Sequence, residues 1–252
     1  MIKEAPYTQL LIKHNILYDT KEKQLEAVKK DWTTIRLIHN PDKEVQMEAV
    51  RQNSHAIRFI TNPDKEAQME AVKQNGLVIQ HIPNPDKDVQ LEAVKQDGWA
   101  IQHIPNPDKD VQLEAVKQTA DTIQLIPSPD KDVQLAAVRR DGEAIRFIRD
   151  PDKDVQLEAV RQNRWSIWHI PNQNKDAQLE AVKQDKRVIC CLHNPDKEVV
   201  MCYLLSIPKA IQLLQDPSYD LKWEEEDEER TMEETNEGSP MCTVVDQRQH
   251  SI

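Results

Sequence analysis

Three histidines stand at one position of a 22-residue period, and imidazole is a common metal ligand and proton carrier near neutral pH. They are His81, His103 and His169. If the period reflects stacked helices, successive copies lie about 8–10 Å apart. Two ligands of one zinc ion, however, each approach it to about 2 Å. Because this spacing is too wide for a shared ion, we expect half-buried packing residues here and no metal site.

Soft ligands gather near the end of the periodic region, at Cys190, Cys191, His193 and Cys202. A vicinal cysteine pair followed by a histidine and a distant cysteine matches no familiar zinc-ligand spacing. We therefore expect these thiols to fill small gaps at the end of the stack. With Cys242, all four cysteines lie in the last third of the chain and cannot form a disulfide framework, which favours reduced thiols and a cytoplasmic protein.

Acidic side chains recur too regularly to form one active site. Asp86, Asp88 and Glu92 have counterparts in nearly every copy of the period, which indicates helix capping and a charged surface. The sequence contains no recognisable set of nucleophile, base and orienting acid, and no phosphate-binding glycine loop. We predict no catalytic residues, no cofactor and no enzymatic activity.

The period itself is carried by the tract NPDKEVQMEAV, which returns with small changes every 22 residues. Its copies begin at Asn40, Asn62, Asn84, Asn106, Ser128, Asp150, Asn172 and Asn194, with a diverged first copy at Tyr18. This pattern predicts an all-α fold, an α-solenoid of nine 22-residue helix-turn-helix repeats over residues 18–215. We expect a capping helix at 1–17 and a disordered acidic tail at 216–252.

Each copy predicts two helices. In the third full copy, Asn84 is expected to cap a helix over 85–96, because Asn-Pro-Asp suits a helix start. The Asp97-Gly98 pair is expected to close this helix and to open a short second helix over 99–104. The predicted core is formed by one apolar face of the first helix together with an isoleucine of the second, which recurs in all nine copies.

A glutamine falls inside the apolar face of the first helix, where a buried amide needs hydrogen-bond partners. We expect a structural ladder in which each glutamine bonds the backbone of the adjacent copy's turn; a ligand-binding row is the alternative. The glutamines of the predicted ladder are Gln46, Gln68, Gln90, Gln112, Gln134, Gln156 and Gln178.

Two positions of the second helix vary among otherwise similar copies, which indicates that packing does not fix them. Tryptophan and arginine are enriched among the residues that anchor protein interfaces. The alternative is drift at unconstrained surface positions. The predicted partner-binding residues are Trp99, Trp165, Trp168, Arg58, Arg146 and Arg164.

The net charge of −11 is unevenly distributed: residues 1–215 carry −2 and residues 216–252 carry −9. A nucleic-acid-binding protein needs a basic excess to displace counterions, so nucleic acid is not the expected partner. Two alternatives stay open: a local nucleic-acid-binding strip of Arg58, Arg146, Arg149 and Arg164, and an inhibitor or nucleic-acid mimic acting through the acidic tail. No apolar run is long enough for a membrane span, and we expect a monomer that binds a protein partner.

The copy NPDKDVQLEAVKQDGWAIQHI resembles HEAT-like and leucine-rich-repeat-variant solenoids, whose first helices open with Asp-Pro and continue with Glu-Val-Arg. Gln90 stands where those families usually place arginine. The copy is more similar still to the short AVKQNG-type helical repeats of uncharacterised bacteriophage, bacterial and giant-virus proteins. This resemblance over 18–215 implies an interaction platform without enzymatic activity.

Overall fold

The computed structural model describes residues 19–208, and every regular element in this range is helical. The predicted all-α solenoid is confirmed, because helical copies pack in sequence order and no strand occurs between residues 19 and 208. The capping helix predicted at 1–17 and the tail predicted at 216–252 lie outside the described residues.

The described residues belong to two compact stacks: residues 19–140 form the N-terminal stack and residues 141–208 the C-terminal stack. The α-helices of the N-terminal stack are α2 (Lys21–Lys30), α3 (Lys43–Gln52), α4 (Lys65–Gln74), α5 (Lys87–Gln96), α6 (Lys109–Gln118) and α7 (Lys131–Arg140). Its 3-10 helices are η1 (Trp32–Leu37), η2 (Ser54–Phe59), η3 (Gly76–His81), η4 (Gly98–His103) and η5 (Ala120–Leu125). The C-terminal stack contains η6 (Gly142–Phe147), α8 (Lys153–Gln162), η7 (Arg164–His169), α9 (Lys175–Gln184), η8 (Lys186–Cys191) and α10 (Lys197–Leu204).

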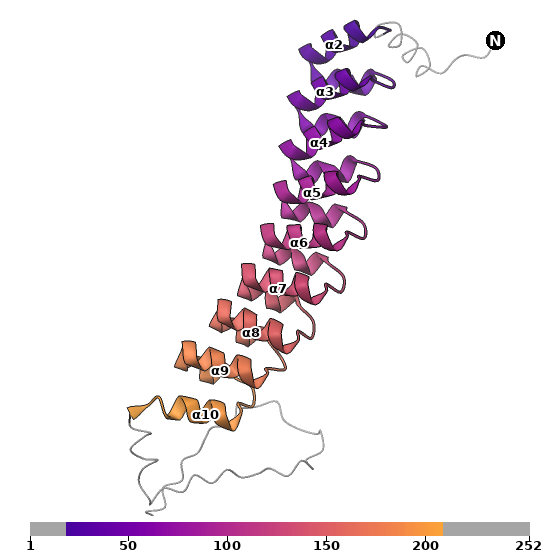
Figure 1. The fold of residues 1–252 in the computed structure, drawn as a ribbon. Coiled ribbons are helices and arrows are strands. Elements are labelled where there is room, and N and C mark those ends of the chain that lie inside the picture. Colours follow the sequence, from indigo (N-terminus) through magenta and orange to yellow (C-terminus); the bar gives the residue numbers. More distant parts are fainter. Residues whose placement is uncertain (1–18, 209–252) are drawn as a thin grey trace, which may run out of the picture. The chain divides into compact units, whose positions relative to one another are not determined.

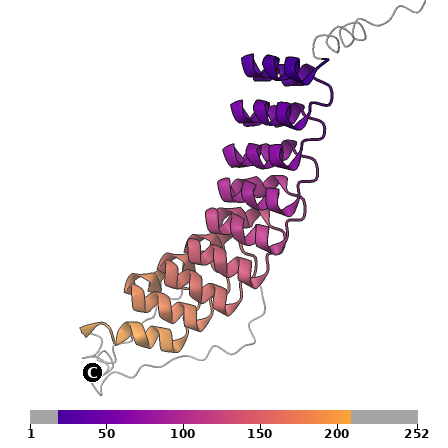
Figure 2. The same cartoon turned by 45° about the horizontal axis from the view of Figure 1, so that its top comes forward.

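Within each stack the α-helices pack on one another in sequence order, as α4 does on α5 and α8 on α9. A 3-10 helix fills the space between neighbouring copies; η4, for example, contacts both α5 and α6. Figures 1 and 2 show the α-helices of each stack side by side, with the connecting loops along one edge. Every copy therefore completes its core only with its neighbours.

The α-helices begin two residues later than predicted, because Asp86 and not Asn84 is the N-cap of α5. The carboxylate of Asp86 accepts a hydrogen bond from the amide of Val89 at 3.1 Å, which satisfies one of the first free N–H groups. Asn84 instead has a φ of 48°, in the left-handed region that asparagine tolerates better than most residues. The asparagine thus makes the turn that ends the preceding copy.

The second helix of each copy is a six-residue 3-10 helix, and in the example copy it covers Gly98–His103 instead of the predicted 99–104. Its N-cap is Asp97, whose carboxylate accepts from the amide of Trp99 at 2.9 Å. The amide of Ile104 closes the other end by donating to the carbonyl of Ile101. So short an element gains little from helix propagation and owes its stability to packing.

The Asp97-Gly98 pair closes α5 and opens η4 as predicted, and glycine at the start of a 3-10 helix also meets a demand for space. A Cβ built on Gly76 would lie 2.3 Å from the carbonyl oxygen of Ala93 in the next copy. The equivalent distance is 2.9 Å for Gly98 and Ala115. The backbones of neighbouring copies therefore approach too closely for a side chain at these points.

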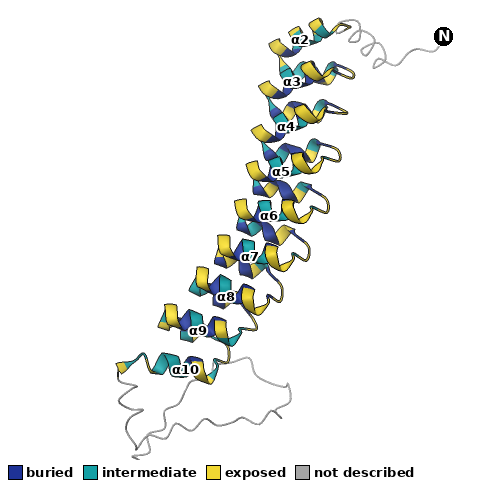
Figure 3. Cartoon of the chain, in the orientation of Figure 1, coloured by how far each residue is buried: buried dark blue, intermediate teal, exposed yellow. Residues whose placement is uncertain are grey.

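The core has the predicted composition. Val89, Ala93 and Val94 on the inner face of α5 are fully shielded from solvent, and Ile101 of η4 is 3 % exposed. Figure 3 shows this alternation of buried and exposed residues along the α-helices of both stacks. Ile189 in η8 is only half-buried, and the next copy of this isoleucine lies outside the described residues.

Candidate functional site

The exposed surface of the 3-10 helices is formed by their second and fifth residues, and we call it the 3-10 face. These are the two variable positions identified from the sequence. At the fifth position of η7, Trp168 is 65 % exposed, and at the second position of η4, Trp99 is 36 % exposed. The third and fourth residues of η4, Ala100 and Ile101, are buried. Variation therefore coincides with exposure at the fifth position of every described 3-10 helix, whereas the second position is exposed in half of them and half-buried in the others.

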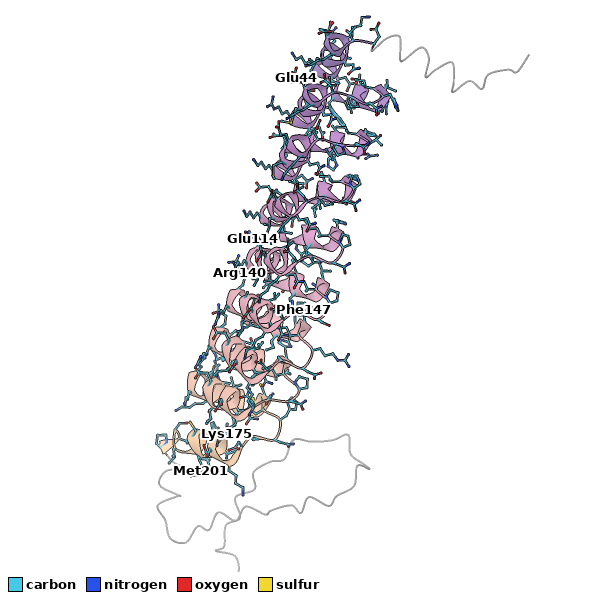
Figure 4. All side chains as sticks on the ribbon, turned by 45° about the vertical axis from the view of Figure 1, so that its right-hand side comes forward. Glu44, Glu114, Arg140, Phe147, Lys175 and Met201 are labelled. Atoms are coloured by element: carbon cyan, nitrogen blue, oxygen red, sulfur yellow. The ribbon has the colours of Figure 1, made fainter. Side chains whose placement is uncertain are left out.

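Two arginines of the 3-10 face lie over aromatic rings of their own helices. The guanidinium carbon of Arg58 is 4.7 Å from the ring centroid of Phe59 in η2, and that of Arg146 is 4.6 Å from the ring centroid of Phe147 in η6. Figure 4 labels Phe147 among the side chains of the C-terminal stack. Stacking of this kind holds an arginine in place and leaves its outer surface accessible.

Arg164 occupies a different position from the other predicted arginines. It is the first residue of η7, is half-buried, and lies 5.8 Å from the ring centroid of Trp165. Its Nε donates to Oδ2 of Asp185 at 3.2 Å. Asp185 also accepts hydrogen bonds from the guanidinium of Arg187, which hold the pKa of this carboxyl well below its usual range. Arg164 is therefore engaged with the scaffold.

The structure brings only some of the predicted partner-binding residues together. Arg146, Trp165 and Trp168 lie on η6 and η7, which pack against each other in the C-terminal stack. Trp165 is half-buried there, so Trp168 is the more accessible of the two rings. Arg58 and Trp99 belong to the N-terminal stack, on η2 and η4, with η3 between them in the chain.

The predicted ladder, in which each glutamine bonds the turn of the adjacent copy, is wrong for most of these residues. Each side-chain amide instead donates to the carbonyl oxygen five residues earlier, in the turn of its own copy. Donor–acceptor distances run from 2.8 Å at Gln68 to 3.4 Å at Gln178. The other donors are Gln46, Gln90, Gln112, Gln134 and Gln156.

Three of these glutamines also reach the following copy. Oε1 of Gln46 accepts from the amide of Asp64 at 2.8 Å, and Oε1 of Gln178 accepts from the amide of Asp196 at 3.1 Å. Gln156 does the same with the amide of Asn174. All three side chains are buried, so their bonds occupy polar groups that water does not reach.

A second glutamine position was not identified from the sequence. The last residue of α3, Gln52, donates to the carbonyl of Val28 in the preceding copy at 3.0 Å. Gln74 and Gln184 make the same bond to Val50 and Val160. The signal was available, since this glutamine recurs at 22-residue steps at the end of the first helix in most copies. These amides cap free carbonyls at the C-terminal ends of the α-helices.

A row of lysines links copies on the exposed side of the α-helices and was likewise missed. Nζ of Lys65 lies 2.9 Å from Asp86 and 2.7 Å from Asp88, and these bonds raise the pKa of Lys65. In the C-terminal stack, Lys175 pairs with Glu198 at 2.6 Å; Figure 4 labels Lys175. The same step is made by Lys21, Lys43, Lys87 and Lys109. The repeated acids therefore cap helices and pair with the preceding copy.

Two of the recurring histidines, His81 and His169, differ in exposure. His81 is half-buried, and burial together with the nearby charges of Arg58, His55 and His103 lowers its pKa. His169 is exposed, contrary to the predicted half-buried role. Within residues 19–208 no three His, Cys, Asp or Glu side chains converge as a metal site.

One comparison with known proteins is consistent with a short helical repeat. A family model described as "Domain of unknown function (DUF4116)" matches residues 64–107, 86–129 and 130–175. The first two matches start 22 residues apart, so one family unit covers two of the repeats defined above. Neither the comparison with curated proteins nor the comparison with solved structures gave a match.

None of the helices between residues 19 and 208 is long and apolar enough to cross a membrane. The α-helices there have at most 10 residues, whereas a spanning helix needs about 20.

Proposed function

We propose that this chain is a non-enzymatic scaffold that binds a protein partner through the 3-10 face. The observation that carries the proposal is Trp168, which is 65 % exposed, more than Trp99, Leu125 or Leu205, the other exposed large apolar side chains between residues 19 and 208. An exposed tryptophan of this kind is typical of an interface anchor. Its neighbour Arg146, fixed over Phe147, supplies a second residue type enriched in interfaces.

The repeat architecture supports the same proposal. Constant positions fill the core or link copies, while the variable fifth position is exposed in every described 3-10 helix and the second position in half of them. Such a division lets surface residues change without altering the fold, as in other repeat scaffolds. The resemblance to HEAT-like, leucine-rich-repeat-variant and AVKQNG-type repeats belongs to this proposal, as do a cytoplasmic location and a monomeric state.

A nucleic-acid-binding arginine strip is less well supported. Arg164 is held by Asp185 at 3.2 Å, and Arg149 lies beside Asp150 at 4.0 Å. Each carboxylate offsets the positive charge that would attract phosphate. The inhibitor hypothesis depends on the tail at 216–252, which lies outside the described residues.

Quantitative affinity capture from source-cell lysate tests the proposal. The intact chain is compared with Trp168→Ala, with the triple variant Trp99→Ala, Trp165→Ala, Trp168→Ala, and with a chain ending at residue 222. Leu205→Ala is the matched control, because Leu205 is 55 % exposed but lies after α10 and outside the 3-10 face.

The proposal expects a partner that the intact chain, the shortened chain and Leu205→Ala retain and the triple variant loses. For the purified pair, Trp168→Ala alone should weaken binding about 30-fold, the effect of removing a hot-spot residue worth about 2 kcal/mol. If a folded triple variant retains every partner of the intact chain, the 3-10 face is not the binding surface.

A further inference from the structure

The vicinal thiols of η8 were predicted to fill small gaps at the end of the stack, and their exposure contradicts this prediction. Cys190 is exposed and Cys191 is half-buried. Cys190 stands at the fifth position of its 3-10 helix, the position that Trp168 occupies in η7, and therefore belongs to the 3-10 face. Both thiols are free, and their Sγ atoms lie 3.8 Å apart.

This sulfur separation fits a metal ion better than a disulfide. Two sulfurs bound at about 2.3 Å to one tetrahedral ion are about 3.8 Å apart, the separation found here. A disulfide between adjacent residues is unfavourable, because neighbouring Cα atoms are about 3.8 Å apart whereas ordinary disulfides need about 4.4–6.8 Å. The pair is thus arranged to persist as a dithiol and to share one ion.

We propose that Cys190 and Cys191 form a bidentate thiolate site for a divalent d10 metal ion, Zn²⁺ or Cd²⁺. On binding, the aqueous ion forms two metal–sulfur bonds and releases all but two of its bound water molecules. The two thiol protons pass to solvent, so the two thiolates balance the charge of the ion. Its other two positions keep water, and these exchangeable positions face the solvent side of η8, where Cys190 is exposed.

The neighbouring groups determine how the site operates. The Cys190 thiol donates to the carbonyl of Arg187 at 2.9 Å, and this bond is given up when the proton leaves. His193 does not complete the site, since its Nδ1 lies 3.1 Å from the amide of Gln173 and the described residues contain no three-ligand cluster. Two protein ligands therefore hold the ion in an exchangeable and not a structural site.

Titration of the full-length, reduced chain with Cd²⁺ tests the site, using the ultraviolet charge-transfer absorption of cadmium thiolates. We expect one ion per chain and, as a second readout, displacement by Zn²⁺. Cys190→Ser or Cys191→Ser should weaken binding on the order of 100-fold, because each removes the chelate. Cys202→Ser and Cys242→Ser are the matched controls and should retain binding.

The far-ultraviolet circular dichroism and melting temperature of each variant show whether it is folded. Cys190→Ser should leave both unchanged, since that side chain is exposed. The proposal is overturned if folded Cys190→Ser and Cys191→Ser bind Cd²⁺ as tightly as the unaltered chain. It is also overturned if Cys202→Ser or Cys242→Ser abolishes binding, because the ion would then lie elsewhere.

Discussion

Gly76→Ala should destabilise the N-terminal stack although alanine is the better helix former. The new Cβ would lie 2.3 Å from the carbonyl oxygen of Ala93, whereas Cβ atoms in proteins essentially never come closer than 3.0 Å to such an atom. The helices α5 and η3 must therefore separate by about 0.7 Å. The same shift strains the 2.6 Å bond from the Gly76 amide to Gln96. Overpacking costs about 1–3 kcal/mol, while the stiffer unfolded chain returns about 0.4–1 kcal/mol.

The expected net loss is about 1–2 kcal/mol in the free energy of unfolding, measured by urea denaturation followed by circular dichroism. Gly98→Ala is the matched control and should cost less, because its Cβ would lie 2.9 Å from the Ala115 carbonyl oxygen. A Gly76→Ala chain as stable as the unaltered one, or a larger loss for Gly98→Ala, would refute the close backbone approach as the reason for glycine.

Two further predictions concern the links between copies. Gln156→Leu removes a side-chain amide that donates to the carbonyls of Pro151 and Asn172 and accepts from the amide of Asn174. The free energy of unfolding should fall by about 1–3 kcal/mol, because buried polar groups lose their partners. Gln112→Leu, at a half-buried position, should cause a smaller loss in the same denaturation assay. For acid stability, Lys65 and the Val89 amide lower the pKa of Asp86, and the Val111 amide and Lys87 lower that of Asp108. The stability from these carboxylates is present above the unfolded pKa of about 3.9 and is lost as pH falls through the folded values. The melting temperature should therefore decrease as the pH is lowered below about 4, and it should decrease less steeply with pH in Asp108→Asn. An equally steep decrease in that variant would contradict the role assigned to Asp108.

The N-cap residue of the α-helices and the 3-10 geometry of the second helix were not predictable from the sequence. Asn-Pro-Asp contains two residues able to cap, and the sequence alone favoured Asn84. The chain turns sharply between the preceding 3-10 helix and α5, and Asn84 makes this turn with a left-handed φ. Asp86 is therefore the N-cap of α5. Similarly, a six-residue segment such as Gly98–His103 is too short for local preferences to choose between α and 3-10 geometry.

The candidate surface was predicted in part. Trp99 and Trp168 are exposed, as the variation at their positions had suggested, but Trp165 is half-buried. The scaffold contacts of Arg164 were not predictable, because its partner Asp185 is 21 residues away in the chain. The sulfur geometry of Cys190 and Cys191 depends on side-chain directions that the motif spacing does not encode.

The sequence by itself determined the 22-residue period, the all-helical stack and the composition of its core. These features follow from short-range periodicity repeated along the chain, and each copy reports them independently. The tertiary structure alone decided which groups link the copies: Gln52 to Val28, Lys65 to Asp88, and the close contact of Gly76 with Ala93. These contacts join residues 17 to 24 positions apart, so their geometry exists only once two neighbouring copies have packed.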